Sequence, residues 1–122
     1  MLVVPSYSDS WPVFHLGRSY YDRLLSAGVR IYQRRDAMMH AKTVSIDGVW
    51  STVGLPNLDW RSSLHNNEIN AVILGRDFGR QMAAMFGTDV AASDAITLDD
   101  WRHRCLIDRL KEQIARLGAY WL

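Results

Sequence analysis

The sequence lacks most of the features that would assign a function directly. Its single cysteine, Cys105, cannot form an internal disulfide, and no C-x-x-C pair is present. The four histidines lack the spacing of a metal site, and no glycine-rich nucleotide-binding loop occurs. No apolar run approaches the ~18 residues that span a bilayer. A net charge of +1 creates no broad field for nucleic acid. We therefore expect no metal and no nucleic-acid partner, and any anion site must be local.

The length and composition are those of one globular domain over residues 1–122. The chain is 48% hydrophobic and 22% charged, which allows a real core at this size. Hydrophobic periodicity and turn residues predict an α/β fold with a mixed sheet flanked by helices. Strands are expected at residues 1–4, 29–33, 38–46, 49–53 and 68–74. Helices are expected from Ser10 to Gly28, from Asp77 to Gly87, and after the capping pattern at residues 97–100.

Histidine and lysine two positions apart are the strongest functional signal in the chain. His40 and Lys42 fall in the predicted strand 38–46, where residues two apart point to the same face. An imidazole there can act as a nucleophile or carry a proton, and an ammonium group can hold an anionic oxygen. The pair suits chemistry on a phosphate ester.

Four residues after this pair could complete such a site. Asp47 lies off the His40 face, in a predicted turn with Gly48, which favours a structural role over a catalytic one. Gly54 lets the backbone approach a ligand closely. Asn57 can donate to a phosphate oxygen or support its own loop. Glu68 can accept a hydrogen bond from the His40 ring, or lie in solvent at a strand end.

The order H-x-K-x4-D at residues 40–47, followed by Gly54, Asn57 and Glu68, resembles the phospholipase D superfamily. Residues 50–54, 57–62 and 65–68 resemble the C-terminal half of a bacterial cardiolipin synthase more closely. The resemblance implies a fold that forms one half of a pseudo-symmetric pair. It also implies catalytic roles for His40, Lys42, Asp47 and Glu68, phosphate binding by Lys42, Asn57 and Gly54, and no cofactor.

The reaction that the resemblance implies is a phosphatidyl transfer. One phosphatidylglycerol would donate its phosphatidyl group to His40 or its counterpart, and a second would accept it with release of glycerol. One histidine cannot be nucleophile and acid at once, so a second H-x-K motif is needed, from another half or from a homodimer. We expect this chain to be such a half alone, a fragment or a separate gene. The expected location is cytoplasmic, or peripheral on the cytoplasmic side of a bacterial inner membrane.

Two further functions fit the same residues. Leu55 stands where the family usually has serine, and losing that hydrogen bond costs about 1.5–3 kcal/mol, or about 10- to 100-fold in rate. An inactive truncated remnant is therefore one alternative, and a homodimeric phosphodiesterase or nuclease is another.

The last predicted helix carries an apolar stripe made by Ile107, Leu110, Ile114, Leu117 and Trp121. Packing against the sheet is the expected use of such a stripe, and contact with a membrane surface is the alternative.

Overall fold

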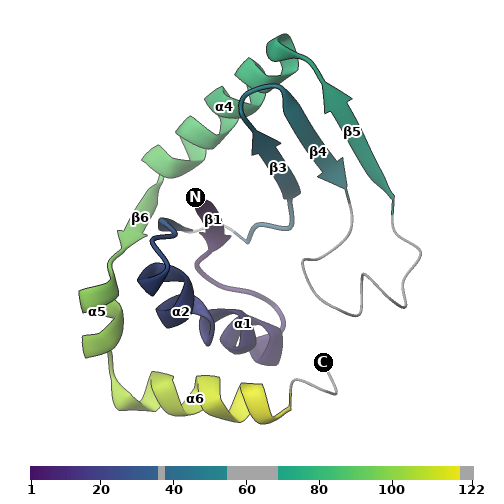
Figure 1. The fold of residues 1–122 in the computed structure, drawn as a ribbon. Helices are drawn as coiled ribbons and strands as arrows, with labels where there is room; N and C mark the ends of the chain where they lie inside the picture. Colours follow the sequence, from purple (N-terminus) through teal and green to yellow (C-terminus); the bar gives the residue numbers. More distant parts are fainter. Residues whose placement is uncertain (36–37, 55–68, 119–122) are drawn as a thin grey trace. The chain divides into compact units, whose positions relative to one another are not determined.

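The structure is a computed structural model that describes residues 1–35, 38–54 and 69–118 (Figure 1). The chain forms two compact units. The first unit comprises residues 1–39 and 90–122, and the second comprises residues 40–89. The predicted α/β class is confirmed, although the strands form two three-stranded sheets instead of one. That residues 1–122 make a single half-domain stays a prediction.

The first unit contains the mixed sheet. Strand β1 (Leu2–Pro5) runs parallel to β2 (Ile31–Arg34), and β6 (Ser93–Ile96) runs antiparallel to β2 on its other side. Strand β6 was not predicted, because its four residues, Ser-Asp-Ala-Ile, have neither an apolar run nor a clear alternation. Its pairing with β2 is a long-range contact that no local pattern encodes.

Among the described residues of this unit, four helices cover the sheet, and two predicted helices each divide into two. The helix expected between Ser10 and Gly28 is α1 (Trp11–Arg18) followed by α2 (Tyr21–Ser26). The break falls at Ser19, whose hydroxyl donates to the Leu16 carbonyl at 2.7 Å. A local serine bond of this kind competes with the helical ladder.

The C-terminal helix is divided in the same way, into α5 (Leu98–His103) and α6 (Leu106–Leu117). Arg104 between them has an extended backbone, with ψ at 163°. The predicted cap is confirmed, since the Thr97 hydroxyl accepts from the Asp100 N–H at 3.1 Å.

The core of the first unit forms where the helices meet the sheet. Tyr21 from α2, Ile31 from β2 and Trp101 from α5 are buried together, and the Tyr21 and Trp101 rings lie 4.9 Å apart. Burial raises the pKa of Tyr21 to about 12. These contacts fix α2 and α5 against the sheet and against each other.

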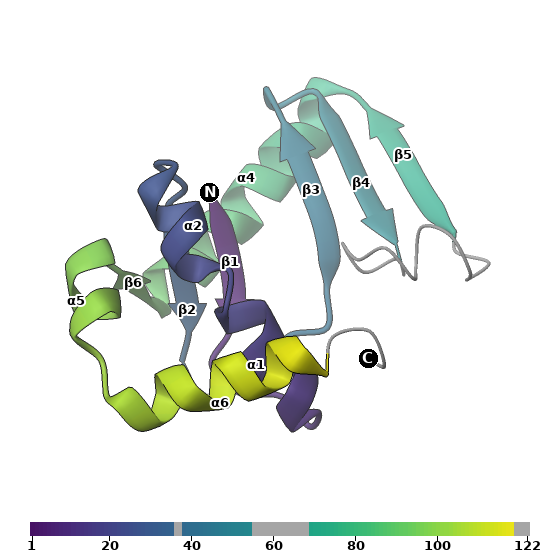
Figure 2. The ribbon, with the colours of Figure 1, turned by 60° about the horizontal axis from the view of Figure 1, so that its bottom comes forward.

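Helix α6 packs against α1 (Figure 2). Its buried residues are Glu112 and Ala115, so the contact does not use the apolar stripe. The prediction that the stripe packs against the sheet is wrong: Ile107 is 63% exposed, Leu110 61%, Ile114 52% and Leu117 87%. A helix turns by about 100° per residue, and residues 112 and 115 therefore lie on a different side from this stripe. Trp121 lies outside the described residues.

The second unit contains an antiparallel sheet in the order β3 (Lys42–Ile46), β4 (Trp50–Gly54) and β5 (Asn70–Leu74). The predicted turn between the first two strands is confirmed. Asp47 and Gly48 have positive φ angles of 53° and 63°, and the Val49 N–H donates to the Ile46 carbonyl at 3.2 Å. Positive φ at both central residues is what a tight hairpin turn of this hand requires.

Helix α4 (Arg76–Ala91) follows β5 and lies against this turn. Asp77 is in its first turn, where it pairs with Arg80, and does not cap the helix as predicted. Gly87 lies inside the helix and does not end it, because a single glycine costs only about 1 kcal/mol in a helix. Gly79 lies so close to the turn that a Cβ there would be 1.9 Å from the Gly48 carbonyl oxygen.

Candidate active site

His40 and Lys42 come together at the start of the second unit. The Lys42 Nζ atom lies 2.7 Å from His40 Nε2 and also donates to the His40 carbonyl at 3.1 Å. Lys42 opens strand β3 and is half-buried, whereas His40 is exposed. The proximity predicted from their spacing is therefore observed.

His40 and Lys42 do not meet as neighbours on one face of a strand. The predicted strand 38–46 begins at Lys42, so His40 lies in the segment that leads into it. The first described pair of this ladder is Lys42 with Gly54, and His40 lies two residues before it. The two side chains meet through their own hydrogen bond, and not through the alternation of a strand.

This hydrogen bond has a definite direction. An ammonium group has only donors, so a charged Lys42 requires His40 Nε2 to accept with its lone pair. The ring proton of a neutral His40 then resides on Nδ1. Nε2 would be the nucleophilic atom, and Nδ1–H would be free to donate to a carboxylate behind the ring.

The end of the sheet beside Lys42 is a row of three residues from three strands. Lys42 pairs with Gly54, and Gly54 pairs with Asn70 at the start of β5. A Cβ on Gly54 would lie 1.8 Å from the Asn70 Oδ1 atom, so the amide group crosses over the glycine. The close neighbour observed at Gly54 is Asn70, and the predicted approach of a phosphate to this glycine stays a prediction. Asn70 was not predicted; its position two residues after Glu68, on the same face of a strand, was the available signal.

Asp47 lies at the opposite end of β3 from Lys42. Four residues lie between them, and five steps along an extended chain span about 16 Å. The structure does not bring Asp47 to the His40–Lys42 pair, and its positive φ fits the structural role at the hairpin turn.

Three sequence positions of interest lie outside the described residues. They are Asn57 and Glu68, which were assigned to phosphate binding and to the His40 ring, and Leu55, which replaces the usual serine. Their roles stay predictions.

The described part of the chain, with gaps at 36–37, 55–68 and 119–122, holds no group of three or more histidine, cysteine or acidic side chains that could bind a metal ion. No helix within those same ranges combines the length and the apolar character needed to cross a membrane.

Comparison with known proteins gives a consistent result. Residues 1–90 match the family model described as "Cardiolipin synthase, PLD-like domain". Cardiolipin synthase A of Serratia proteamaculans is 39% identical over 113 residues, which cover 93% of this chain and 23% of that protein. Cardiolipin synthase A of Proteus mirabilis is 35% identical over the same shares. Cardiolipin synthase 2 of Bacillus anthracis is 36% identical over 116 residues, covering 95% of this chain and 23% of the relative. The chain thus spans about a quarter of the length of these relatives. No solved structure matches it.

Proposed function

Because the chain belongs to the phospholipase D-like domain family of cardiolipin synthases, we propose that it carries one half of a phosphatidyltransferase site. The substrate is phosphatidylglycerol, and the products are cardiolipin and glycerol. The observation that carries this proposal is the 2.7 Å contact between His40 Nε2 and Lys42 Nζ, on the segment that the family model covers.

The chemistry follows from these two side chains. The Nε2 lone pair of His40 attacks the phosphorus of the first lipid, a P–N bond forms, and the P–O bond to the headgroup glycerol breaks. The departing alkoxide takes a proton from the acid of a second motif and leaves as glycerol. A headgroup hydroxyl of the second phosphatidylglycerol then attacks phosphorus and gives its proton to the group of the second motif that first acted as the acid. The P–N bond breaks, and cardiolipin and free His40 result.

Lys42 has a distinct part in this sequence. In the structure its ammonium group occupies the lone pair that must attack phosphorus. A substrate phosphate offers that ammonium group a charged oxygen instead, a stronger hydrogen bond than a neutral ring nitrogen gives. Transfer of Lys42 from His40 to the phosphate frees Nε2 and places a cation where negative charge grows.

The surface around Lys42 supports a lipid substrate. Cross-strand partners share a face of the sheet, so Lys42 lies on the same side as Ile46, Val72 and Leu74. These three side chains are 49%, 57% and 72% exposed. An exposed apolar face beside a phosphate-binding cation matches the two parts of a phospholipid.

The proposal includes a partner and a location. A second H-x-K motif supplies the acid, from another phospholipase D-like half or from a second copy of this chain. The protein works at the cytoplasmic face of the inner membrane, where phosphatidylglycerol is available. Asp47 holds the hairpin turn, Glu68 accepts from His40 Nδ1–H, and Asn57 binds a phosphate oxygen.

The decisive experiment follows the phosphatidyl group. The chain is mixed with cardiolipin synthase A of Serratia proteamaculans from which the matching segment has been deleted, and with vesicles of ³²P-labelled phosphatidylglycerol. We expect labelled cardiolipin, and a labelled band of this chain after rapid denaturation. Both should vanish in His40→Ala and persist in His103→Ala, which changes an exposed histidine on α5. Cardiolipin formation that persists in His40→Ala would overturn the proposal. Cleavage of bis-nitrophenyl phosphate by a dimer, without lipid transfer, would favour the phosphodiesterase alternative.

A further inference from the structure

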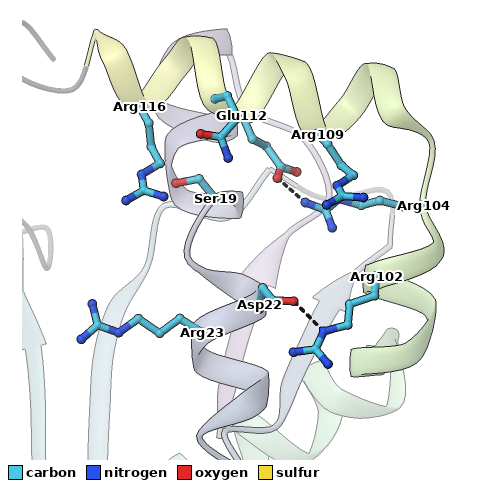
Figure 3. A pocket seen from close by; sticks show the side chains of 9 residues that line it. Ser19, Asp22, Arg23, Arg102, Arg104, Arg109, Glu112 and Arg116 are labelled. Carbon is cyan, nitrogen blue, oxygen red and sulfur yellow. Dashed lines mark hydrogen bonds and ion pairs between the residues drawn. The ribbon is translucent and has the colours of Figure 1, made fainter.

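The first unit has a polar pocket that the proposed reaction does not use. It encloses about 510 Å³ between α2, α5 and α6 (Figure 3). Five arginines and two carboxylates line it, which gives a formal charge of +3, together with Ser19 and Gln113. The arginines are Arg23, Arg102, Arg104, Arg109 and Arg116. On a chain with a net charge of +1, this is a strong local concentration of positive charge.

Two of the five arginines already form ion pairs with carboxylates of this chain. Arg102 donates to Asp22 at 2.9 Å, and this bond lowers the pKa of Asp22. Arg104 pairs with the buried Glu112, and its guanidinium lies 3.9 Å from the centre of the Trp101 ring. Both carboxylates of the pocket are therefore already paired.

The other three arginines face the pocket without a carboxylate of their own. Arg23, Arg109 and Arg116 have no hydrogen bond or ion pair from their side chains to any residue within the described ranges. They come from two elements, α2 and α6, and Figure 3 shows Arg23 and Arg116 on one side of the pocket and Arg109 beside Arg104 on the other. Guanidinium groups that line one pocket can bind the oxygens of a phosphate group.

The pocket adjoins the exposed apolar surface of α6. Arg109, Gln113 and Arg116 line the pocket from one edge of this helix. At 100° per residue, the next edge of the helix carries Leu106, Leu110 and Leu117, followed by Ile107 and Ile114. Leu106 thus joins the four described residues of the predicted stripe, and these five residues, called the apolar stripe from here on, are each at least 52% exposed. Arginines along the border of an exposed apolar stripe are the pattern of a helix that lies in a membrane interface.

We propose that α6 docks on an anionic lipid bilayer, with the phosphate of a lipid headgroup in the arginine pocket and the apolar stripe in the headgroup–acyl boundary. A soluble phosphate compound would account for the pocket but not for the adjacent stripe. A second copy of the chain would cover the stripe but would set this positive pocket near another positive pocket. A bilayer with anionic headgroups matches both parts. The inference rests on the membrane location proposed above, and not on the reaction at His40.

The test measures sedimentation of the chain with vesicles of phosphatidylglycerol and phosphatidylcholine, compared with phosphatidylcholine alone. We expect binding to the anionic vesicles that weakens with added salt. The triple variant Arg23→Gln, Arg109→Gln, Arg116→Gln should bind about 100-fold more weakly, at about fivefold for each arginine. The control loses the same charge elsewhere, by Arg30→Gln, Arg76→Gln and Arg80→Gln, three exposed arginines outside the pocket. The affinity of this control variant for anionic vesicles should fall clearly less than that of the pocket variant.

A second pair of variants tests the apolar stripe. Ile114→Gln should weaken vesicle binding by about 10-fold. Val13→Gln on α1, where the side chain is equally exposed at 52%, should leave it unchanged. Circular dichroism spectra like that of the parent chain establish that each variant is folded.

Three results would overturn the inference. The first is equal loss of binding in the pocket triple and its charge-matched control. The second is a stable dimer that Ile114→Gln dissociates, with no vesicle binding by the parent chain. The third is binding of glycerol phosphate or inorganic phosphate in the pocket without vesicle binding. Failure of lipid transfer in a chain that still binds vesicles through α6 would instead count against the reaction at His40.

Discussion

Replacing Glu112 by glutamine should destabilise the first unit strongly while keeping the size of the side chain. Glu112 is 2% exposed and serves two cations at once. It pairs with Arg104, and its Oε1 atom lies 3.7 Å from Arg18 Nε. Both guanidinium groups also lie over the Trp101 ring, 4.8 Å (Arg18) and 3.9 Å (Arg104) from its centre. One buried carboxylate therefore faces two cations that are stacked on a core aromatic ring.

The size of the effect follows from how much water the two cations retain. Breaking a buried ion pair by removing one partner costs about 3–5 kcal/mol. The Arg18 and Arg104 side chains are each 17% exposed, against 3% for Glu112, so water compensates part of the loss. We therefore expect the free energy of unfolding to fall by about 3 kcal/mol, the low end of that range. In a chain of this length the melting temperature should fall by about 10–15 °C.

Urea denaturation followed by circular dichroism measures this change. Asp94→Asn is the control, because its pair with Arg35 has side chains that are 69% and 49% exposed, and it should cost less than about 1 kcal/mol. A double-mutant cycle adds Arg104→Gln, and the loss in the double variant should be smaller than the sum of the two single losses. Additive losses, or a Glu112→Gln variant as stable as Asp94→Asn, would refute the argument that one carboxylate holds both arginines.

Three other predictions use the same structure. Gly79→Ala should cost about 1–3 kcal/mol in urea denaturation, because its Cβ would strike the Gly48 carbonyl, whereas Gly87→Ala on the same helix has open space and should be neutral or stabilising. Burial lowers the pKa of His15 below 6.5, so as the pH falls this histidine is protonated in the unfolded chain before it is protonated in the folded one. The free energy of unfolding should therefore decline as the pH falls through 6.5 towards the lowered pKa. His15→Phe should make the free energy of unfolding less dependent on pH in this range. Lys42→Gln should slow cardiolipin formation about 10- to 100-fold with little change in the urea midpoint.

Local signals in the sequence were sufficient for the features that depend on neighbouring residues. The hairpin turn at Asp47–Gly48, the Thr97 cap and the proximity of His40 to Lys42 all formed as predicted. Each depends on residues fewer than five positions apart. Their geometry is set by backbone sterics and short-range hydrogen bonds, which a sequence pattern records directly.

Features that depend on distant residues were predicted less well. Strand β6 exists because β2 offers it a partner about 60 positions away along the chain, and its own four residues carry no strand pattern. The start of β3 was placed four residues too early, because the pairing with β4 that begins at Lys42 is not encoded in the local pattern of residues 38–46. A break at position 19 divides a helix whose apolar spacing looked continuous.

The sequence by itself determined the family, the α/β class and the pair of side chains proposed for the chemistry, because a motif of fixed spacing and the alternation of apolar residues are properties of the chain alone. Only the tertiary structure decided that the apolar stripe of α6 faces outward and that Arg23 shares a pocket with Arg109 and Arg116. The reason is that helix packing chooses one face of α6 for burial. In α6 the buried residues are Glu112 and Ala115, the helix packs against α1, and the apolar residues remain exposed.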